Sequence, residues 1–190
     1  MGKNPSLTLV EASKEQLDQN ANPATRKIHA DALLLNLREK FDLVIMRSSL
    51  DYFPSREMQV RLLKRIAAHL KHRGVFVNQC ASLPTVEQRD LANRIYAASD
   101  KIGRRHFQAD AEVKKLYAEA GFAARFLGHA PRLQITHRDH VQRYGLKPVE
   151  VVGIKEIIRG VPQGKRPLIK EKRAGYEMSF TFPIYAARKR

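Results

Sequence analysis

The sequence predicts an α/β protein built around a mostly parallel β-sheet. The first observation is an apolar run at residues 41–46, broken only by Asp42, which suits a strand covered on both faces. The second is a set of apolar residues at helical spacing between Met58 and Leu70. The third is a further apolar segment at residues 75–77. A strand, a helix and a strand at this spacing form a right-handed βαβ crossover.

The ends of the central helix carry their own signals. The hydroxyl of Ser55 can accept a hydrogen bond from an otherwise unpaired backbone N–H at the helix start. Glu57 in the first turn and the basic residues 71–73 in the last turn both suit the helix dipole. Gly74 is expected to end the helix, because glycine readily takes a positive φ. The two flanking strands are therefore expected to be neighbours in the sheet.

Length and composition limit the class of protein. A chain of 190 residues with 43% apolar content is long enough to bury a core within one domain. No apolar run approaches the roughly 20 residues that span a bilayer, so no membrane association is expected. No signal peptide opens the chain, and the single Cys80 excludes an internal disulfide. These features predict a cytoplasmic protein.

The net charge is high. The chain has 35 Lys and Arg against 19 Asp and Glu, which gives +16. A basic surface concentrates anionic partners, so nucleic acid is one possible partner. However, the charges are spread along the chain without a recognisable nucleic-acid-binding module. The alternative is a solvated basic surface on a protein that acts on a small-molecule or anionic substrate.

The remaining elements follow from the same patterns. Further strands are expected at residues 7–10, 27–31, 74–79, 122–127 and 178–187, and further helices at 14–20, 86–99 and 110–120. Pro183 inside the last strand predicts an edge position or a bulge.

Residues 128–175 differ in composition from the rest of the chain. They hold six of the ten glycines and four prolines, which predicts a long connection with one or two small elements. Such a connection would act as a lid or a substrate platform. The expected division is an α/β core at residues 1–127, this basic insertion at 128–175, and a last strand at 176–190 that completes the core.

The central stretch resembles a known family. FDLVIMRSSLDYFP, followed by LLKRIAAHLKHRGVFVNQ, is similar to the fourth strand, fourth helix and fifth strand of class I S-adenosylmethionine-dependent methyltransferases. Residues 50–53 stand where the family has a loop of LHHF type, and Leu70–Gly74 has His-Arg-Gly where the family has Pro-Gly-Gly. The resemblance implies a Rossmann-like, three-layer αβα fold whose last strand is antiparallel to the others.

The resemblance extends to the expected cofactor residues. LTLVEAS looks like the family's second strand, whose terminal carboxylate, here Glu11, accepts hydrogen bonds from both ribose hydroxyls. IHADAL looks like the region whose aspartate contacts the adenine amino group, here Asp31. Taken singly, Glu11 also fits a helix-entry charge and Asp31 a turn residue. The implied S-adenosylmethionine-binding set, at one edge of the sheet, is Glu11, Ala30, Asp31, Ala32, Met46 and Arg47.

One part of the family pattern has no counterpart in this sequence. The family has a glycine-rich G-x-G-x-G loop after its first strand, whose glycines let the backbone approach the cofactor. Neither that strand nor the loop is found, so the first strand is expected to be missing. The chain then resembles a truncated methyltransferase, or one that needs a partner chain to supply the strand. We expect residues 1–190 alone to bind S-adenosylmethionine weakly or not at all, without measurable methyl transfer.

Candidates for catalysis are few, since methyl transfer needs alignment and, for a hydroxyl acceptor, proton removal. Asp51 and Tyr52 are the polar side chains of the loop after the fourth strand. Asp51 fits either a base or a helix-entry carboxylate, and Tyr52 fits either a substrate contact or a packing aromatic. His137 and His140 have a spacing that could hold a metal in a helix, but no third ligand is evident, so no metal is expected.

Three functions remain open at this point. The first is a methyltransferase acting on a small-molecule or anionic acceptor. The second is a methyltransferase-like module that binds or assembles without catalysis. The third is a basic RNA-associated protein. Whether the chain alone is an enzyme is left open by the missing glycine-rich loop.

Overall fold

The computed structural model describes residues 6–190, which form two compact units, one up to Lys40 and one from Phe41 to Arg190. The first unit contains β1 (Leu7–Glu11), α1 (Lys14–Asp18) and β2 (Thr25–His29). The two strands are parallel, and their register runs from Leu7 opposite Thr25 to Glu11 opposite His29. Both strands were expected from the sequence, although β2 ends two residues earlier than predicted.

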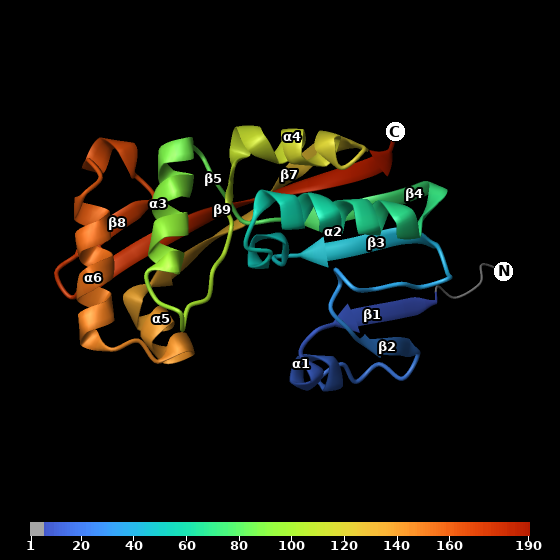
Figure 1. Ribbon diagram of the computed structural model, residues 1–190, viewed down its shortest axis with the longest axis horizontal. Coiled ribbons are helices and arrows are strands. Elements are labelled where there is room, and N and C mark those ends of the chain that lie inside the picture. Colours follow the sequence, from blue (N-terminus) through green and yellow to red (C-terminus); the bar gives the residue numbers. More distant parts are fainter. Residues whose placement is uncertain (1–5) are drawn as a thin grey trace. The chain divides into compact units, whose positions relative to one another are not determined.

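The second unit holds one mixed sheet with helices packed on it (Figure 1). Its strands are β3 (Phe41–Arg47), β4 (Leu70–Gln79), β5 (Ser82–Leu83), β6 (Gln108–Ala109), β7 (Phe122–Thr136), β8 (Ile169–Lys172) and β9 (Gly175–Lys189). Its α-helices are α2 (Arg56–His69), α3 (Val86–Ala97), α4 (Asp110–Glu119), α5 (His137–Tyr144) and α6 (Pro148–Arg159), and its 3₁₀ turns are η1 (Leu50–Tyr52) and η2 (Gln163–Lys165).

The sheet of the second unit has the predicted α/β topology, but the expectation that β1 and β2 belong to the same sheet is wrong, because within residues 6–190 they pair only with each other. β3 and β4 are parallel neighbours, with Val44 opposite Phe76 and Ile45 opposite Val77, so the crossover through α2 is confirmed. The order continues from β4 to β9, and β9 also pairs with β5, β7 and β8. β9 is antiparallel to β4 and to β7, as expected for the last strand.

Pro183 lies inside β9 and pairs with His129 of β7, so the predicted edge position is wrong, and the nearest bulge lies in β7 beside this pair. On one side β9 leaves β4 after Ile184 and meets β5 at Thr181, so no ladder bond to these strands is needed from Pro183 itself. On the other side the register with β7 shifts between Phe126 and Gly128. A residue without a backbone N–H is tolerated where the ladder changes partner.

The end of α2 differs from the prediction. The helix ends at His69, because Leu70 has extended backbone, and residues 71–73 belong to β4 instead of the last helical turn. Gly74 is not a helix stop. A Cβ at Gly74 would lie 2.8 Å from the carbonyl oxygen of Phe41, so glycine is needed there for the close approach of β3.

The two faces of β3 are not equally covered. On one face, Phe76 of β4 is fully buried against Tyr117 of α4 and Phe122 of β7. On the other face, Leu43 and Ile45 are 51% and 68% exposed, so the expectation of a strand covered on both faces is wrong for these residues. The apolar run in the sequence is compatible with a strand buried on both faces. It does not show that other elements pack on the second face of β3.

Residues 128–175 are more ordered than the composition suggested. β7 continues to Thr136, and α5, α6 and β8 follow it. The reason is that α6 buries three apolar residues, Val151, Ile154 and Ile158, in the main core of the second unit. Glycine and proline occur at the element ends: Gly145 ends α5 with φ of 63°, and Pro148 opens α6.

Candidate functional site

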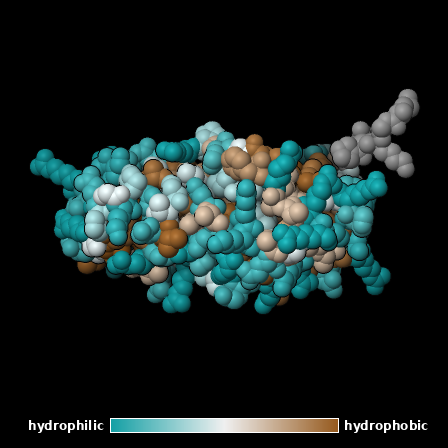
Figure 2. Space-filling view, turned by 90° about the horizontal axis from the view of Figure 1, so that it is seen from above, coloured by the Kyte–Doolittle hydropathy of each residue, from teal (hydrophilic) through white to brown (hydrophobic). Residues whose placement is uncertain are grey.

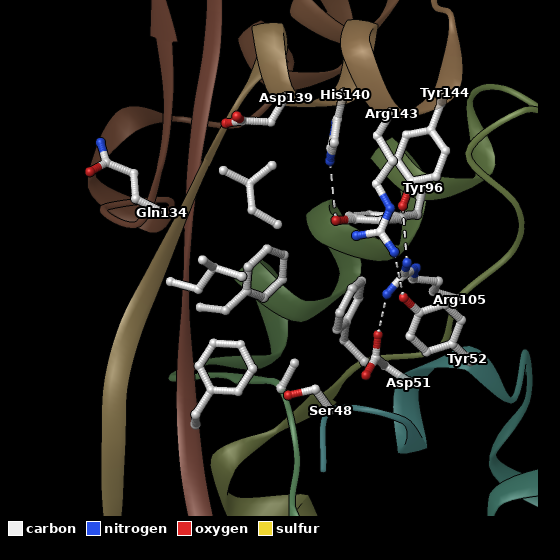
Figure 3. A pocket seen from close by; sticks show the side chains of 16 residues that line it. Ser48, Asp51, Tyr52, Tyr96, Arg105, Gln134, Asp139, His140, Arg143 and Tyr144 are labelled. Atoms are coloured by element: carbon white, nitrogen blue, oxygen red, sulfur yellow. Dashed lines mark hydrogen bonds and ion pairs between the residues drawn. The ribbon is translucent and has the colours of Figure 1, made fainter. Parts of the chain in front are cut away.

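A cavity of about 320 Å³ lies within the second unit, next to the loop that follows β3. Figure 3 shows most of the labelled polar side chains gathered around Asp51 and Arg105, with Gln134 and Asp139 apart from that group. The lining residues are Ser48, Asp51, Tyr52, Ala81, Tyr96, Arg105, Phe107, Leu133, Gln134, Ile135, Asp139, His140, Arg143, Tyr144, Phe180 and Phe182. Segments far apart in the sequence therefore build one small-molecule-sized site.

The loop after β3 turns sharply into the cavity wall. Ser48 has a φ of 50°, which is unusual for a residue with a side chain, and its N–H donates to the carbonyl of Gln79 at 2.8 Å. This turn ends the pairing with β4 and leads into the short turn η1, where Leu50 and Asp51 are buried. Strained backbone is often found beside binding sites, and here it directs the chain from the sheet to the cavity.

Asp51 and Arg105 form a buried ion pair at the cavity. The Arg105 guanidinium donates to Asp51 Oδ2 at 2.7 Å, and the two side chains are 11% and 4% exposed. Burial raises the pKa of Asp51, although the charge of Arg105 opposes that shift. The second carboxylate oxygen, Asp51 Oδ1, is buried and has no hydrogen-bond partner among residues 6–190. A buried carboxylate oxygen without a donor is costly, so this group differs from an ordinary structural ion pair.

Arg105 is held by aromatic rings as well as by Asp51. Its guanidinium carbon lies 3.7 Å from the ring centre of Tyr52 and 5.1 Å from that of Tyr96, and it donates to the Tyr144 hydroxyl at 3.0 Å. The Tyr52 hydroxyl in turn accepts a hydrogen bond from Arg143 at 3.1 Å. These contacts fix both guanidinium groups at the cavity, since stacking and charge-assisted bonds restrict their orientation.

His140 is part of the cavity wall and is held by two tyrosines. Its Nδ1 lies 2.7 Å from the Tyr176 hydroxyl and its Nε2 3.2 Å from the Tyr96 hydroxyl. Burial lowers the pKa of His140 to about 4, and the nearby charge of Arg105 lowers it further. Both ring nitrogens are thus taken up by tyrosines. Among residues 6–190, no cluster of three potential metal-ligating side chains is found.

The shifted pKa of His140 predicts a pH-dependent stability. The unfolded chain binds a proton on this group near pH 6.5, whereas the folded protein does so only near pH 4. We expect this contribution to stability to be lost as the pH falls through this range, amounting to about 2–3 kcal/mol at pH 4. Denaturant unfolding of wild type and His140→Phe between pH 4 and 7.5 measures the difference. The exposed His72→Phe is the control, and an unchanged slope in His140→Phe would contradict the prediction.

Apolar side chains also line the cavity. Phe107 and Phe180 stack with ring centres 4.9 Å apart, and Tyr96 packs edge-on against both. β7 adds Leu133, which is 49% exposed, and the partly buried Ile135, with Gln134 between them. The site thus combines polar and apolar lining residues, as is typical of small-molecule pockets.

The two acidic residues of the first unit lie at the ends of its strands, although Asp31 follows β2 and does not lie inside it as predicted. Glu11 ends β1, and Asp31 follows β2 after Ala30, whose N–H donates to the Glu11 carbonyl at 3.1 Å. Since β1 and β2 are parallel, both carboxylates lie at the same edge of this pair. Each accepts a local backbone bond, Glu11 from Ser13 at 2.9 Å and Asp31 from Leu33 at 2.8 Å. These bonds match the helix-entry role considered for Glu11 and the turn role considered for Asp31. Each bond uses one carboxylate oxygen, Oε1 of Glu11 and Oδ1 of Asp31.

Met46 and Arg47 end β3 in the second unit. They pair with Asn78 and Gln79 of β4, and the Arg47 carbonyl accepts a hydrogen bond from the Ser49 hydroxyl at 2.9 Å. Met46 and Arg47 therefore lie at the carboxyl end of β3, next to the turn at Ser48. This is the position at which ligands of open α/β sheets bind.

Sequence reasoning found only part of this site. Asp51 and Tyr52 were singled out and do line the cavity. Arg105 and Arg143 were missed, because a basic residue in a basic chain has no distinguishing local pattern. His140 was weighed as a metal ligand against a solvated basic segment, whereas the structure buries it. Its partner Tyr96 lies 44 positions earlier in the sequence, and nothing local indicates their contact.

Comparisons with known proteins agree with this arrangement. Residues 1–78 match the family model described as a methyltransferase domain. The YcgJ protein of Bacillus subtilis has a similar structure, with 18% identity over 96% of this chain and 82% of that chain and a TM-score of 0.74. A protein of Bacillus halodurans C-125 assigned as a methyltransferase has 16% identity, the same coverage of both chains and a TM-score of 0.75.

A third similar structure is that of LepI in complex with SAH and a substrate analogue. It has 15% identity over 67% of this chain and 33% of that chain, with a TM-score of 0.52. No curated protein sequence matches this chain. In residues 6–190, the longest helices are too short and too polar to cross a membrane.

These findings confirm the resemblance to class I methyltransferases. The fold of the second unit is the Rossmann-like methyltransferase fold, with parallel β3 and β4 and an antiparallel β9. The family model covers the stretch that contains β1, β2, β3 and most of β4. At these levels of identity the structures establish the fold and leave the acceptor of the methyl group to be argued from the site.

Proposed function

We propose that this chain is an S-adenosylmethionine-dependent methyltransferase module whose cavity binds a small-molecule acceptor. The observation that carries the proposal is the cavity itself, which adjoins the loop after β3 in a methyltransferase fold. In open α/β sheets, ligands bind at the carboxyl ends of the strands, and this loop leaves such an end. The methyltransferase domain match and the SAH-bound LepI structure support the choice of cofactor.

When bound, S-adenosylmethionine supplies the methyl group, and its sulfur is the leaving group. We assign to Asp51 the role of general base. It would accept the proton that the acceptor's hydroxyl or amine releases as the new bond to carbon forms and the carbon–sulfur bond breaks. Its raised pKa makes this carboxylate a better base, and Oδ1 is the oxygen without a partner among the described residues. Tyr52 is assigned a positioning role, because its ring and hydroxyl hold both guanidinium groups.

We assign cofactor contacts to each unit separately. In the first unit, Glu11 would hold the ribose hydroxyls and Asp31 the adenine amino group, with Ala30 and Ala32 beside it. In the second unit, Met46 and Arg47 at the end of β3 are the residues assigned to the cofactor. The local bonds of Glu11 and Asp31 support this assignment, because they fix each carboxylate and leave it acceptor capacity.

The glycine-rich loop is the part of the proposal that lies outside these residues. Because no G-x-G-x-G occurs in the sequence, we propose that an upstream segment or a partner chain supplies it. Isothermal titration with S-adenosylmethionine should show weak or no binding to residues 1–190 alone. Adding the loop-bearing segment should restore binding and transfer of an isotope-labelled methyl group. Tight binding by residues 1–190 alone would show that another loop replaces the glycine-rich one.

The role of Asp51 is tested in the active, reconstituted form. Asp51→Asn should lower kcat by about 100-fold or more, as expected for loss of a general base, and should remove the acidic limb of the pH–rate profile. A structural role would lower activity without changing the shape of that profile. Glu57→Gln, an exposed change in the first turn of α2, is the control. No binding and no transfer in the reconstituted form would favour the non-catalytic module.

The net charge of +16 keeps RNA association as a second candidate. Figure 2 shows hydrophilic side chains over most of the visible face, with apolar ones scattered among them. A gel shift with RNA at several salt concentrations decides this question, because phosphate contacts weaken steeply with salt. Salt-sensitive binding at physiological ionic strength would support the RNA candidate, and its absence would leave the small-molecule proposal alone.

A further inference from the structure

We infer that the acceptor bound in the cavity is a small monocarboxylate with an apolar body, and that Arg143 recognises its carboxylate. That the ligand is a methyl acceptor rests on the proposed function, whereas the specificity of binding rests on the cavity alone. Four charged side chains line the cavity: Asp51, Arg105, Asp139 and Arg143. Their contacts show which of these charges are already satisfied.

Two acidic and one basic group of the cavity have partners. Asp51 and Arg105 are paired with each other at 2.7 Å. The Asp139 carboxylate accepts bonds from the N–H and the hydroxyl of Thr136, at 2.7 and 2.8 Å, and so closes the first turn of α5. Those bonds lower the pKa of Asp139 and keep it charged. His140 adds no charge near neutral pH, because its pKa is about 4.

Arg143 is the second cation of the cavity, while Asp139, whose bonds come from the neutral Thr136, keeps its negative charge. Its hydrogen bond goes to the neutral Tyr52 hydroxyl at 3.1 Å, and its guanidinium carbon lies 5.4 Å from the ring centre of Tyr144. Within residues 6–190 it has no carboxylate within ion-pair distance. Both contacts orient a planar guanidinium while leaving N–H donors free, which is the arrangement that binds a carboxylate through two parallel bonds.

The apolar lining sets the body of the acceptor. Phe107 and Phe180 are each 2% exposed and Phe182 is 6% exposed, so the apolar surface open to a ligand comes mainly from Leu133, which is 49% exposed, and the partly buried Ile135. These side chains suit an apolar body of the acceptor. A cavity of about 320 Å³ is at the small end of ligand pockets and holds a small molecule.

One spare guanidinium favours a single negative charge. A phosphate group carries up to about two charges and three acceptor oxygens, and it usually meets several cations or backbone N–H groups together. Here Arg105 is already committed to Asp51, and in the first turn of α5 the N–H of Asp139 already donates to the Thr136 hydroxyl at 3.3 Å. The donor set therefore matches a carboxylate better than a phosphate.

The test compares probes of one shape and different charge. Isothermal titration of residues 1–190 with 4-hydroxybenzoate and with the uncharged 4-hydroxybenzamide measures the preference for a carboxylate. We expect the carboxylate to bind at least tenfold more tightly. We expect Arg143→Gln to abolish this preference while the binding of the amide stays the same. Arg138→Gln removes an exposed arginine from the same helix, outside the cavity, and should keep the preference.

The outcomes separate this inference from the proposed function. Equal binding of the two probes, binding of neither, or a preference that survives Arg143→Gln would overturn the inference. Since the titration uses no cofactor, its result does not depend on methyl transfer. A carboxylate preference without cofactor binding by the reconstituted form would support the specificity and contradict the methyltransferase. Methyl transfer to an uncharged acceptor, with no carboxylate preference, would support the methyltransferase and contradict the carboxylate specificity.

Discussion

Replacing Arg105 by methionine should lower the free energy of unfolding by about 3–5 kcal/mol at pH 7. The change leaves the Asp51 carboxylate buried without its counter-charge, and an unpaired buried charge is far more costly than the pair was worth. It also removes the cation stacked on Tyr52. Denaturant unfolding of the purified protein measures the loss, and Arg61→Met on the exposed face of α2 should change stability by less than about 0.5 kcal/mol.

The pH dependence tests the cause of this loss. A carboxylate whose pKa is raised on folding favours the folded state at low pH, and that contribution disappears as the pH rises past the raised pKa. Without Arg105 the pKa of Asp51 should rise further, so the deficit of Arg105→Met relative to wild type should shrink as the pH falls. Adding Asp51→Asn should recover much of the loss at pH 7. A deficit that is the same at every pH would mean that lost packing, and not the buried charge, is responsible.

The second large effect is expected at Phe76. This residue is fully buried in β4 and packs against Tyr117 and Phe122, so Phe76→Ala should cost about 3–5 kcal/mol through lost contacts and the cavity left behind. Phe126→Ala on the neighbouring part of the sheet removes the same atoms from a side chain that is 41% exposed. It should cost about 1 kcal/mol. Similar losses for both variants would show that β4 is not the centre of the core.

Much of the fold could be predicted because its signals are local. The apolar run of β3, the Ser55 cap and the periodicity of α2 each lie within a few residues, and all three are confirmed. The predicted end of α2 was wrong because Gly74 is needed for close packing against the backbone of Phe41. Phe41 lies 33 positions earlier and comes close only in the sheet. The helices after β7 were missed because glycine and proline mark element ends as often as they mark loops.

The site was less predictable than the fold. Asp51 could be named because it lies in the loop that follows a recognisable strand. Arg105 comes 54 residues later, Tyr144 lies 39 beyond it, and their contacts exist only after α3, α5 and β9 have packed. Charge and aromatic content show no periodicity that would link them. The cofactor residues Glu11 and Asp31 remain predictions, since the local bonds they make are equally those of a turn.

The position of β9 affects the order in which the protein can be made. This strand pairs with β4, β5, β7 and β8, and all four precede it in the chain. During synthesis on the ribosome, the earlier strands must wait with unpaired edges until Gly175–Lys189 emerges. Closing such distant pairs carries a loop-closure entropy, so folding of the second unit should be slow and should follow translation. A nascent chain stalled before Gly175 should therefore be sensitive to protease, and it should be a ready client for chaperones.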